Sequence, residues 1–447
     1  AQAAEDLQIG YSVYPAGTTV IPSAQPYRPF VLTMLQPQRY PEVRNATDAG
    51  ILEPYDVASW SLPLSMGVEV VEASEPLGTA LEPLVEANWP RPQIDESAAG
   101  HLIPAASDSA YSAINRLLAD GVDVHRLAED SEIGNRGDIW LSAAGVDASK
   151  LGEIADELHV PVIPLANAPE IALLQVGSAR VGLFKPWVAS MDEGWTRFVL
   201  EQYEFPLATI SNEQIRSGEF TDQVDVLLFP DVSSSIISKG EPAKGSRYRR
   251  WWTPRPPKYS GGIDTFPKAD DAAMKKKDEI KKTKGGERIK KWVEGGGTVV
   301  ALDSSSQYFI DLFELPVSDV LANVDHDDFN CPGSTLRVEM NTDSPLTFGM
   351  QAQEAIYFGD SPAFRTRVPD PRFERTVVAR YPDDDKDILL SGYLEGGELL
   401  EKRAAVVEIE VGKGRVILIG FRAQHRAQPV RTFKLLFNTL YTIEAPG

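Results

Sequence analysis

Residues 295–306, Gly-Gly-Gly-Thr-Val-Val-Ala-Leu-Asp-Ser-Ser-Ser, contain the pattern that decides the fold. The glycines end a segment in which Ile289, Trp292 and Val293 recur at helical spacing, so they predict the end of a helix. The five residues Thr298–Leu302 then predict a short, fully buried strand. A strand that is apolar on both faces is typical of a parallel sheet covered by helices.

The same alternation of strand and helix extends toward the amino terminus. Residues 225–229 form a second apolar run, and residues 180–184 form a third. Between these two runs lies an amphipathic segment that predicts a helix, which we expect Asp192 to cap. Because successive strands joined by helices pack in parallel, we predict an α/β domain over residues 176–447 with a doubly wound parallel sheet.

Four further regions complete the predicted organisation. Residues 1–90 are rich in proline, β-branched and aromatic residues and indicate a β-rich segment, with strands at 18–21 and 67–71. Residues 91–175 alternate strand and helix and predict a small α/β domain. Two insertions interrupt the larger domain, a basic one at 239–291 and a β-rich one at 317–410.

Charge and composition exclude some classes of partner. The chain has 447 residues, with 44 basic and 65 acidic side chains, and its net charge of −21 disfavours binding to nucleic acid or to anionic membranes. No apolar run reaches the roughly 18–20 residues of a membrane span. The basic insertion contains Trp251 and Trp252, but interleaved acidic residues favour a surface loop that docks on a partner domain. The first residues lack a signal-peptide pattern and an initiator methionine, so we expect a mature or trimmed chain.

The histidines do not predict a metal site. Zinc peptidases use short His-x-x-Glu or His-x-x-x-His spacings, and none of the five histidines begins either motif. His125 and Glu129 lie four residues apart but in a stretch that reads as strand and loop, and the acidic residues 325–328 are better interpreted as a solvated loop. We therefore expect no cofactor in this chain.

The closing segment resembles the end of the class I glutamine amidotransferase-like fold. Residues 414–425 form an apolar strand that delivers His425 just before a helix. In that fold the histidine activates a cysteine at a strand-to-helix elbow, and a glutamate two residues further orients it. Here the second position is Ala427, and the elbow carries Asp303 and Ser304. The resemblance therefore implies a degenerate site without a catalytic residue.

A crevice at the end of the predicted sheet is the candidate ligand site. Loops at the carboxyl ends of parallel strands bind ligands, so Asp231, Asp303, Ser304 and His425 are predicted to share one crevice. A second interpretation, that both aspartates cap helices or turns, is equally open at this stage. A third has Ser304 or Cys331 act as a nucleophile with His425, although no third triad member is evident.

Several distinctive strings are spread across essentially the whole chain, at 36–41, 55–57 with Trp60, 184–187, 191–197, 330–334, 361–364 and 420–429. These strings resemble a bacterial family of large zinc carboxypeptidase-like proteins. The family has an amino-terminal peptidase domain that holds the zinc, followed by an amidotransferase-like tail without its cysteine. The resemblance implies a secreted or periplasmic protein linked to peptide turnover, and none of the family's catalytic residues can be carried onto this chain.

Three functions follow as hypotheses. The first is a non-catalytic accessory half that packs against a zinc peptidase domain, in the same precursor or as a separate processed chain. The second is a binding module whose crevice holds a sugar, a peptide or another small polar ligand. The third is an independent hydrolase that uses Ser304 or Cys331 with His425. A homo-oligomer is compatible with all three.

Overall fold

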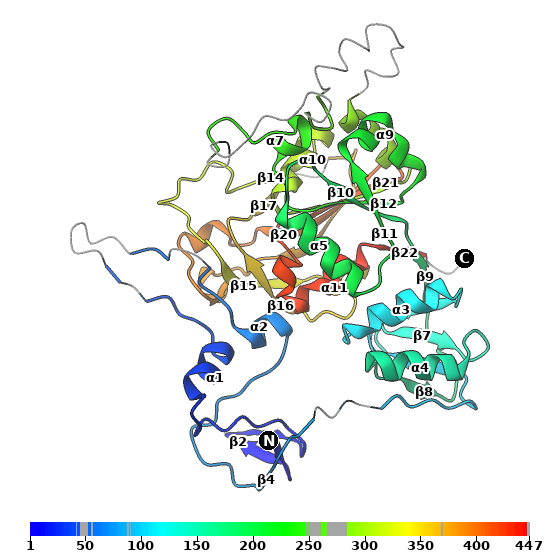
Figure 1. Cartoon of the computed structure of the whole chain (residues 1–447), viewed down its shortest axis with the longest axis vertical. Coiled ribbons are helices and arrows are strands. Elements are labelled where there is room, and N and C mark those ends of the chain that lie inside the picture. Colours follow the sequence, from blue (N-terminus) through cyan, green and yellow to red (C-terminus); the bar gives the residue numbers. More distant parts are fainter. Residues whose placement is uncertain are drawn as a thin grey trace.

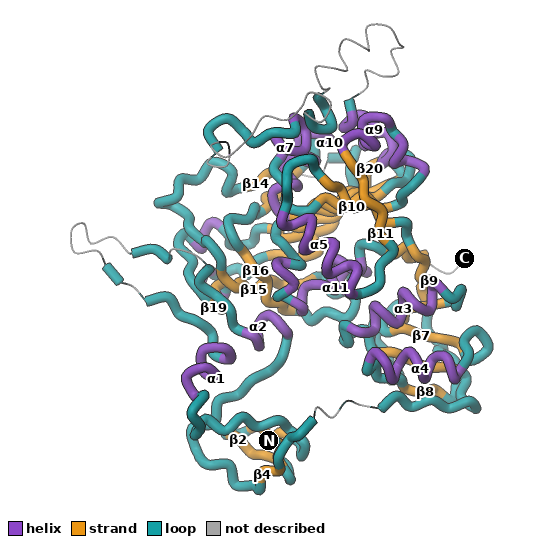
Figure 2. The backbone as a smooth tube through the Cα atoms, viewed as in Figure 1, coloured by secondary structure: helices purple, strands orange, loops and turns teal. Residues whose placement is uncertain are grey.

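The computed structural model describes residues 1–41, 43–44, 52–54, 57–86, 89, 91–246, 249, 261–265, 284–367 and 370–444. Within these ranges the chain is a mixed α/β protein with a large and a smaller sheet and an amino-terminal segment that lies to one side (Figures 1 and 2). Most of the basic insertion, including Trp251 and Trp252, lies outside the described residues. No helix in the described ranges is both long and apolar enough to cross a membrane.

The large sheet has twelve strands, and one half of it is parallel. Its main path runs β11-β10-β12-β13-β21-β20-β18-β15-β16. The chain enters at β10, moves outward to β11 and then crosses back to β12, so the strand order reverses between β10 and β12. The parallel strands are β10 (Val181–Lys185), β11 (Leu207–Ser211), β12 (Val226–Phe229), β13 (Thr298–Leu302) and β21 (Gly414–Ile419).

The other half of this sheet is antiparallel and comes from the β-rich stretch predicted at 317–410. These strands extend the same sheet beyond β21 and do not form a separate layer. They are β14 (Val317–Asp319), β15 (Ser334–Met340), β16 (Gln353–Phe358), β17 (Phe364–Thr366), β18 (Arg375–Arg380), β19 (Leu389–Ser391) and β20 (Ala404–Val411).

Alternate side chains of the parallel strands enter two different cores. In β12, Val226 and Leu228 belong to one core, and Leu227 and Phe229 belong to the other. The first core includes α5 (Met191–Gln202) and α11 (Phe433–Asn438). The second includes α6 (Asn212–Ser217), α7 (Ser234–Lys239), α9 (Gly285–Glu294) and α10 (Ser306–Phe313).

The smaller sheet is antiparallel throughout and has the order β22-β9-β6-β7-β5-β8. Helices α3 (Ser109–Ala119) and α4 (Ala148–Leu158) contribute apolar side chains to the core that this sheet shares. One edge strand, β22, comes from the far end of the chain and pairs with β9. The strands are β5 (Gly100–Ile103), β6 (Val124–Leu127), β7 (Ile139–Ser142), β8 (Ile163–Leu165), β9 (Leu173–Ser178) and β22 (Tyr441–Glu444).

Buried contacts join the two sheets into one body. The Tyr111 hydroxyl lies 3.0 Å from Asn438 Oδ1 and donates to the Phe348 carbonyl oxygen at 3.1 Å. Gly349 has a φ of +74°, and a Cβ atom there would lie 2.2 Å from the Ala105 carbonyl oxygen. Only glycine fits this close approach of the two parts of the chain.

The amino-terminal segment contains less β structure than its composition predicts. Neither predicted strand forms in full: the stretch 18–21 makes only a single antiparallel bridge, Gln2–Thr19, beside β1, and no strand of the described residues pairs with 67–71. Residues 67–71 instead follow a short helix, and Val68, Val70 and Val71 are exposed. The elements present are β1 (Gln2–Ala3), β2 (Leu7–Ile9), β3 (Ser12–Tyr14), β4 (Leu81–Glu82), α1 (Arg28–Leu35) and α2 (Leu62–Met66).

Candidate functional site

Asp303 occupies the tight turn between β13 and α10. It has a φ of +51°, a left-handed conformation that costs a non-glycine residue roughly 1–3 kcal/mol. The turn continues as the 3₁₀ helix η5 (Asp303–Ser305), and the Asp303 side chain is buried. Asp303 therefore stands at a strained strand-to-helix elbow.

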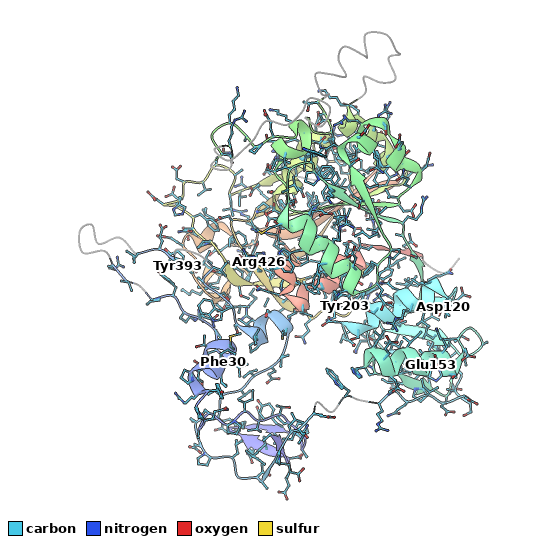
Figure 3. All side chains as sticks on the ribbon, in the orientation of Figure 1. Phe30, Asp120, Glu153, Tyr203, Tyr393 and Arg426 are labelled. Carbon is cyan, nitrogen blue, oxygen red and sulfur yellow. The ribbon has the colours of Figure 1, made fainter. Side chains whose placement is uncertain are left out.

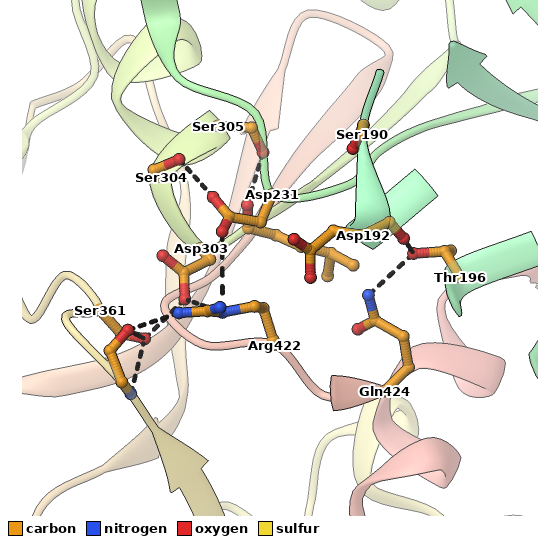
Figure 4. A network of polar contacts seen from close by, with 12 residues as sticks. Ser190, Asp192, Thr196, Asp231, Asp303, Ser304, Ser305, Ser361, Arg422 and Gln424 are labelled. Atoms are coloured by element: carbon orange, nitrogen blue, oxygen red, sulfur yellow. Dashed lines mark hydrogen bonds and ion pairs between the residues drawn. The ribbon is translucent and has the colours of Figure 1, made fainter. Parts of the chain in front are cut away.

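Arg422 joins the carboxylates at this edge of the sheet (Figure 4). Asp303 Oδ2 accepts hydrogen bonds from Ser361 Oγ at 2.5 Å and from Arg422 Nε at 3.2 Å. The same Nε atom lies 3.7 Å from Asp231 Oδ2, and Ser304 Oγ donates to Asp231 Oδ1. The structure thus brings together Asp231, Asp303 and Ser304, three of the four residues predicted to share the crevice.

These side chains come from the carboxyl ends of adjacent strands. Asp231 follows β12, Asp303 follows β13 and Arg422 follows β21. Neither aspartate caps a helix, because α7 begins after Ser233 and Asp303 itself lies inside η5. The interpretation of both aspartates as helix caps is therefore wrong.

Asp192 adds a third carboxylate. The expectation that it caps α5 is wrong, because the cap is Ser190, whose hydroxyl accepts from the Glu193 backbone N–H at 3.1 Å. Asp192 is the second residue of the helix and points toward Asp231 and Arg422 (Figure 4). Burial and then the charge of Asp231 raise the pKa of Asp192 to about 6.

Burial and neighbouring charges also shift the pKa values of Asp303 and Arg422. Burial, followed by the nearby Asp231, raises the pKa of Asp303 well above its usual range, although Arg422 opposes the shift. Burial alone would lower the pKa of Arg422, but Asp303, Asp231 and Asp192 together raise it, so the guanidinium stays charged. The cluster therefore places three carboxyl groups around the Arg422 guanidinium, and Arg426 is a further positive charge that acts on Asp192.

His425 lies near the cluster but does not act on Ser304. It begins the 3₁₀ helix η9 (His425–Ala427), and its ring stacks on Tyr357 with centroids 3.7 Å apart. Its Nδ1 atom is buried and has no hydrogen-bond partner among the described residues. Burial, followed by Arg422 and Arg426, lowers the pKa of His425 to about 3, so the ring is neutral. Since Ser304 Oγ donates to a carboxylate instead, the serine–histidine pair of the hydrolase hypothesis is not formed.

Cys331 is fully buried just before β15. Burial raises the pKa of its thiol to about 12, so almost no thiolate exists at neutral pH. A thiol must be both ionised and accessible to act as a nucleophile. The geometry therefore gives no support to Cys331 as the catalytic residue.

Four members of the site were not among the predicted site residues. They are Asp192, Ser361, Arg422 and Gln424, and Figure 4 shows them around the predicted aspartates. Each lies in one of the strings that carry the resemblance, at 191–197, 361–364 and 420–429. That common membership is the signal in the sequence that could have identified them.

A cavity lies at the opposite edge of the sheet, where the parallel strands begin. It has a volume of about 640 Å³ and is lined by residues such as Lys291, Trp292 and the ion pair between Arg180 and Asp225, whose closest atoms are 2.7 Å apart. None of the predicted site residues reaches it. Among the described residues, no group of three or more His, Cys, Asp or Glu side chains is arranged to hold a metal ion.

Comparisons with known proteins give no family for the chain. No family model and no curated protein matches it. Solved structures with distant similarity include a cytoplasmic protein from Salmonella typhimurium (14% identity, 58% of this chain and 97% of that one, TM-score 0.33). Others are a proposed ThuA-like protein from Bacteroides uniformis (11%, 61% and 92%, 0.32) and a proposed GMP synthase component from Thermoplasma acidophilum (11%, 59% and 94%, 0.30). These likenesses are too distant to assign a function.

Proposed function

We propose that this chain is a non-catalytic accessory half of a secreted or periplasmic zinc carboxypeptidase-like protein. Residues 1–89 would pack against the peptidase domain, which would hold the zinc. The observation that carries the proposal is where apolar side chains are exposed. In the described part of the chain, 16 of the 21 exposed large apolar side chains lie within residues 1–89. Exposed apolar surface on this scale is typical of interaction sites.

The helix α1 shows this exposure most clearly. None of its residues is buried, and Phe30 is 65% exposed (labelled in Figure 3). Tyr11, Val13 and Tyr27, elsewhere in the segment, are also exposed. An eight-residue helix is marginal in water without tertiary packing, so a covering partner would stabilise it. The link to a peptidase domain rests on the sequence resemblance.

The geometry of the crevice supports a non-catalytic role. The elbow holds a buried aspartate, His425 is neutral and stacked on Tyr357, and the thiol of Cys331 is buried and protonated. The finer description of the larger domain, a doubly wound sheet of the amidotransferase type with a degenerate site, belongs to the same proposal. It is supported by the strand reversal beside β10 and by helices that contribute to both cores.

Purification from the native source, without denaturants, tests the proposal. Intact mass spectrometry and metal analysis should find a zinc-bearing peptidase domain, either in the same polypeptide or as a second chain. Where it is a second chain, Phe30→Ser should release it, whereas Phe198→Ser should not, because Phe198 is an exposed phenylalanine on α5, outside the segment. Where the two share one polypeptide, Phe30→Ser should increase hydrogen exchange in residues 1–89. A zinc-free protein of about 49 kDa with no partner would refute the proposal.

A ligand-binding module is the second candidate. Asp231, Asp303 and Arg422 gather at the carboxyl edge of the parallel strands, where such sheets bind ligands. Thermal stabilisation by a small polar compound would favour this function, because a ligand that binds only the native state raises the apparent stability. The two candidates are compatible, since they use different parts of the chain.

A further inference from the structure

The cavity where the parallel strands begin has the dimensions of a small-molecule site. Its volume of about 640 Å³ falls within the roughly 300–1,000 Å³ that such sites occupy. Part of its wall consists of glycines, namely Gly218 after α6 and Gly295–Gly297 after α9. Trp292 supplies an aromatic ring to the lining. The cavity therefore combines exposed backbone, an apolar surface and room for a ligand.

The side chains that line the cavity carry an excess of positive charge. Arg180, Arg288 and Lys291 line it together with one carboxylate, that of Asp225, so three positive charges stand against one negative charge. Arg180 holds this carboxylate, because its Nε and Nη2 atoms donate to the two oxygens at 3.0 and 2.7 Å. The acidic residues that adjoin the lining in the sequence do not line the cavity; they are Glu219, Asp222, Glu287 and Glu294. The local excess is opposite in sign to the net charge of −21 on the whole chain.

Helix dipoles offset only part of this excess. Helices α6 and α9 both end at the cavity, and the carboxyl end of a helix carries roughly half a negative charge. Lys291, in the last turn of α9, is therefore favourable to its own helix even without a ligand. The two helix ends together supply about one negative charge, against an excess of about two positive charges from the side chains. About one positive charge remains, which a ligand with one negative charge would balance.

Two close contacts with glycine hold a cation and an aromatic ring at the cavity wall. Arg288 lies against Gly218, where a Cβ atom would come within 3.1 Å of Arg288 Nη1. Trp292 lies on Gly297, where a Cβ atom would come within 2.4 Å of the indole. The indole also meets the ring of Phe220 edge-on, with centroids 5.5 Å apart. Because Arg288 and Trp292 are partly buried by these contacts, less side-chain freedom is left to lose when a ligand binds.

We propose that this cavity binds a small aromatic carboxylate. Arg288 and Lys291 bind the carboxylate group, and the indole of Trp292 contacts the aromatic ring of the ligand. A guanidinium and an ammonium suit this group because both donate charge-assisted hydrogen bonds to carboxylate oxygens. An aromatic ring suits the indole because paired rings gain from their geometry as well as from burial. The inference is independent of both candidate functions, since none of its residues lies in residues 1–89 or in the cluster around Arg422.

Three small compounds separate the contributions of the charge and the ring. Benzoate has both, acetate has the charge without the ring, and benzyl alcohol has the ring without the charge. The full chain is titrated with each at pH 7.5 and about 0.15 M ionic strength, where exposed charges are screened beyond about 8 Å. In ligand-observed NMR, benzoate should bind in the low millimolar range. Acetate and benzyl alcohol should each bind at least about fivefold more weakly.

Substitutions then locate the site. Lys291→Gln should weaken benzoate binding about fivefold, and because Lys291 is exposed this variant should fold normally. Lys386→Gln is the matched control, because it removes the same charge from an exposed residue that does not line the cavity, and it should leave binding unchanged. Trp292→Leu should abolish the preference for benzoate over acetate. No benzoate binding up to about 50 mM, equal affinity for acetate or benzyl alcohol, or an unchanged affinity in Lys291→Gln would overturn the proposal.

Discussion

Replacing His425 with phenylalanine should make the protein less sensitive to acid. The ring is 5% exposed and stacks on Tyr357, so phenylalanine preserves the aromatic contact and removes the titration. The pKa of His425 is lowered from 6.5 to about 3 by burial and then by Arg422 and Arg426. A lowered folded-state pKa contributes stability that is fully present above pH 6.5 and is lost as the pH falls toward 3.

The size of the effect follows from this shift. Each pKa unit corresponds to about 1.4 kcal/mol, so the folded protein should lose about 2.5 kcal/mol between pH 6 and pH 4 through His425 alone. Other groups, such as Asp192, titrate in the same range with the opposite sign, because their folded-state pKa is raised. The difference between wild type and His425→Phe cancels those groups and isolates residue 425.

Urea unfolding at pH 4, 5, 6 and 7.5, followed by near-ultraviolet circular dichroism, measures that difference. The free energy of unfolding of His425→Phe, relative to wild type, should rise by about 2–3 kcal/mol as the pH falls from 6 to 4. His326→Phe is the matched control, because His326 is exposed and should show little such change. A relative free energy that stays constant to within about 0.5 kcal/mol across this range would refute the assignment of His425 as a buried neutral ring.

Three further predictions concern other parts of the chain. The thiol of Cys331 should not react with Ellman's reagent at pH 8 in the native protein and should react stoichiometrically in urea; rapid native reaction would show that the thiol is accessible. Asp303→Leu should lower the free energy of unfolding at pH 7 by about 2–4 kcal/mol, because it leaves Arg422 and Ser361 without their acceptor, whereas Asp303→Asn keeps an acceptor oxygen and should cost less. Urea unfolding distinguishes these outcomes, and equal losses would contradict the assignment of Asp303 as the acceptor for both groups. Deleting residues 441–447 should increase hydrogen exchange in β9, which loses its paired strand, and unchanged protection there would show that the pairing is dispensable.

The sequence predicted the parallel strands well, because they are continuous apolar runs bounded by turn residues. Thr298–Leu302 has the predicted bounds, and the aspartates that follow β12 and β13 meet because carboxyl ends of parallel strands share one edge. Arg422 follows the predicted strand at 414–419 and could have been placed at this edge by the same reasoning. Ser361 could not, because it lies in a loop between antiparallel strands and nothing in its local pattern indicates that it reaches Asp303.

Elsewhere the local pattern indicated conformation but not pairing. Residues 67–71 favour an extended chain, yet they form no strand because no strand of the described residues pairs with them. The last strand, β22, pairs with β9, although the two strands are far apart in the sequence. The four residues of β22 alone do not indicate which distant strand they pair with. The residue that caps α5 was also ambiguous from the local sequence. Ser190 and Asp192 are both good capping residues, and only the backbone geometry decides between them.

The pairing of β22 with β9 also constrains the order of events during synthesis. Domains generally fold as the ribosome releases them, with the earliest part of the chain first. Here the small sheet is encoded between Gly100 and Ser178, but one edge strand emerges only after residue 440 has been added. Until then β9 presents an open edge on the nascent chain, which is the kind of surface that chaperones shield and that aggregates when translation stops early. A chain that stops before residue 441 would therefore be more damaged than the loss of one short strand suggests.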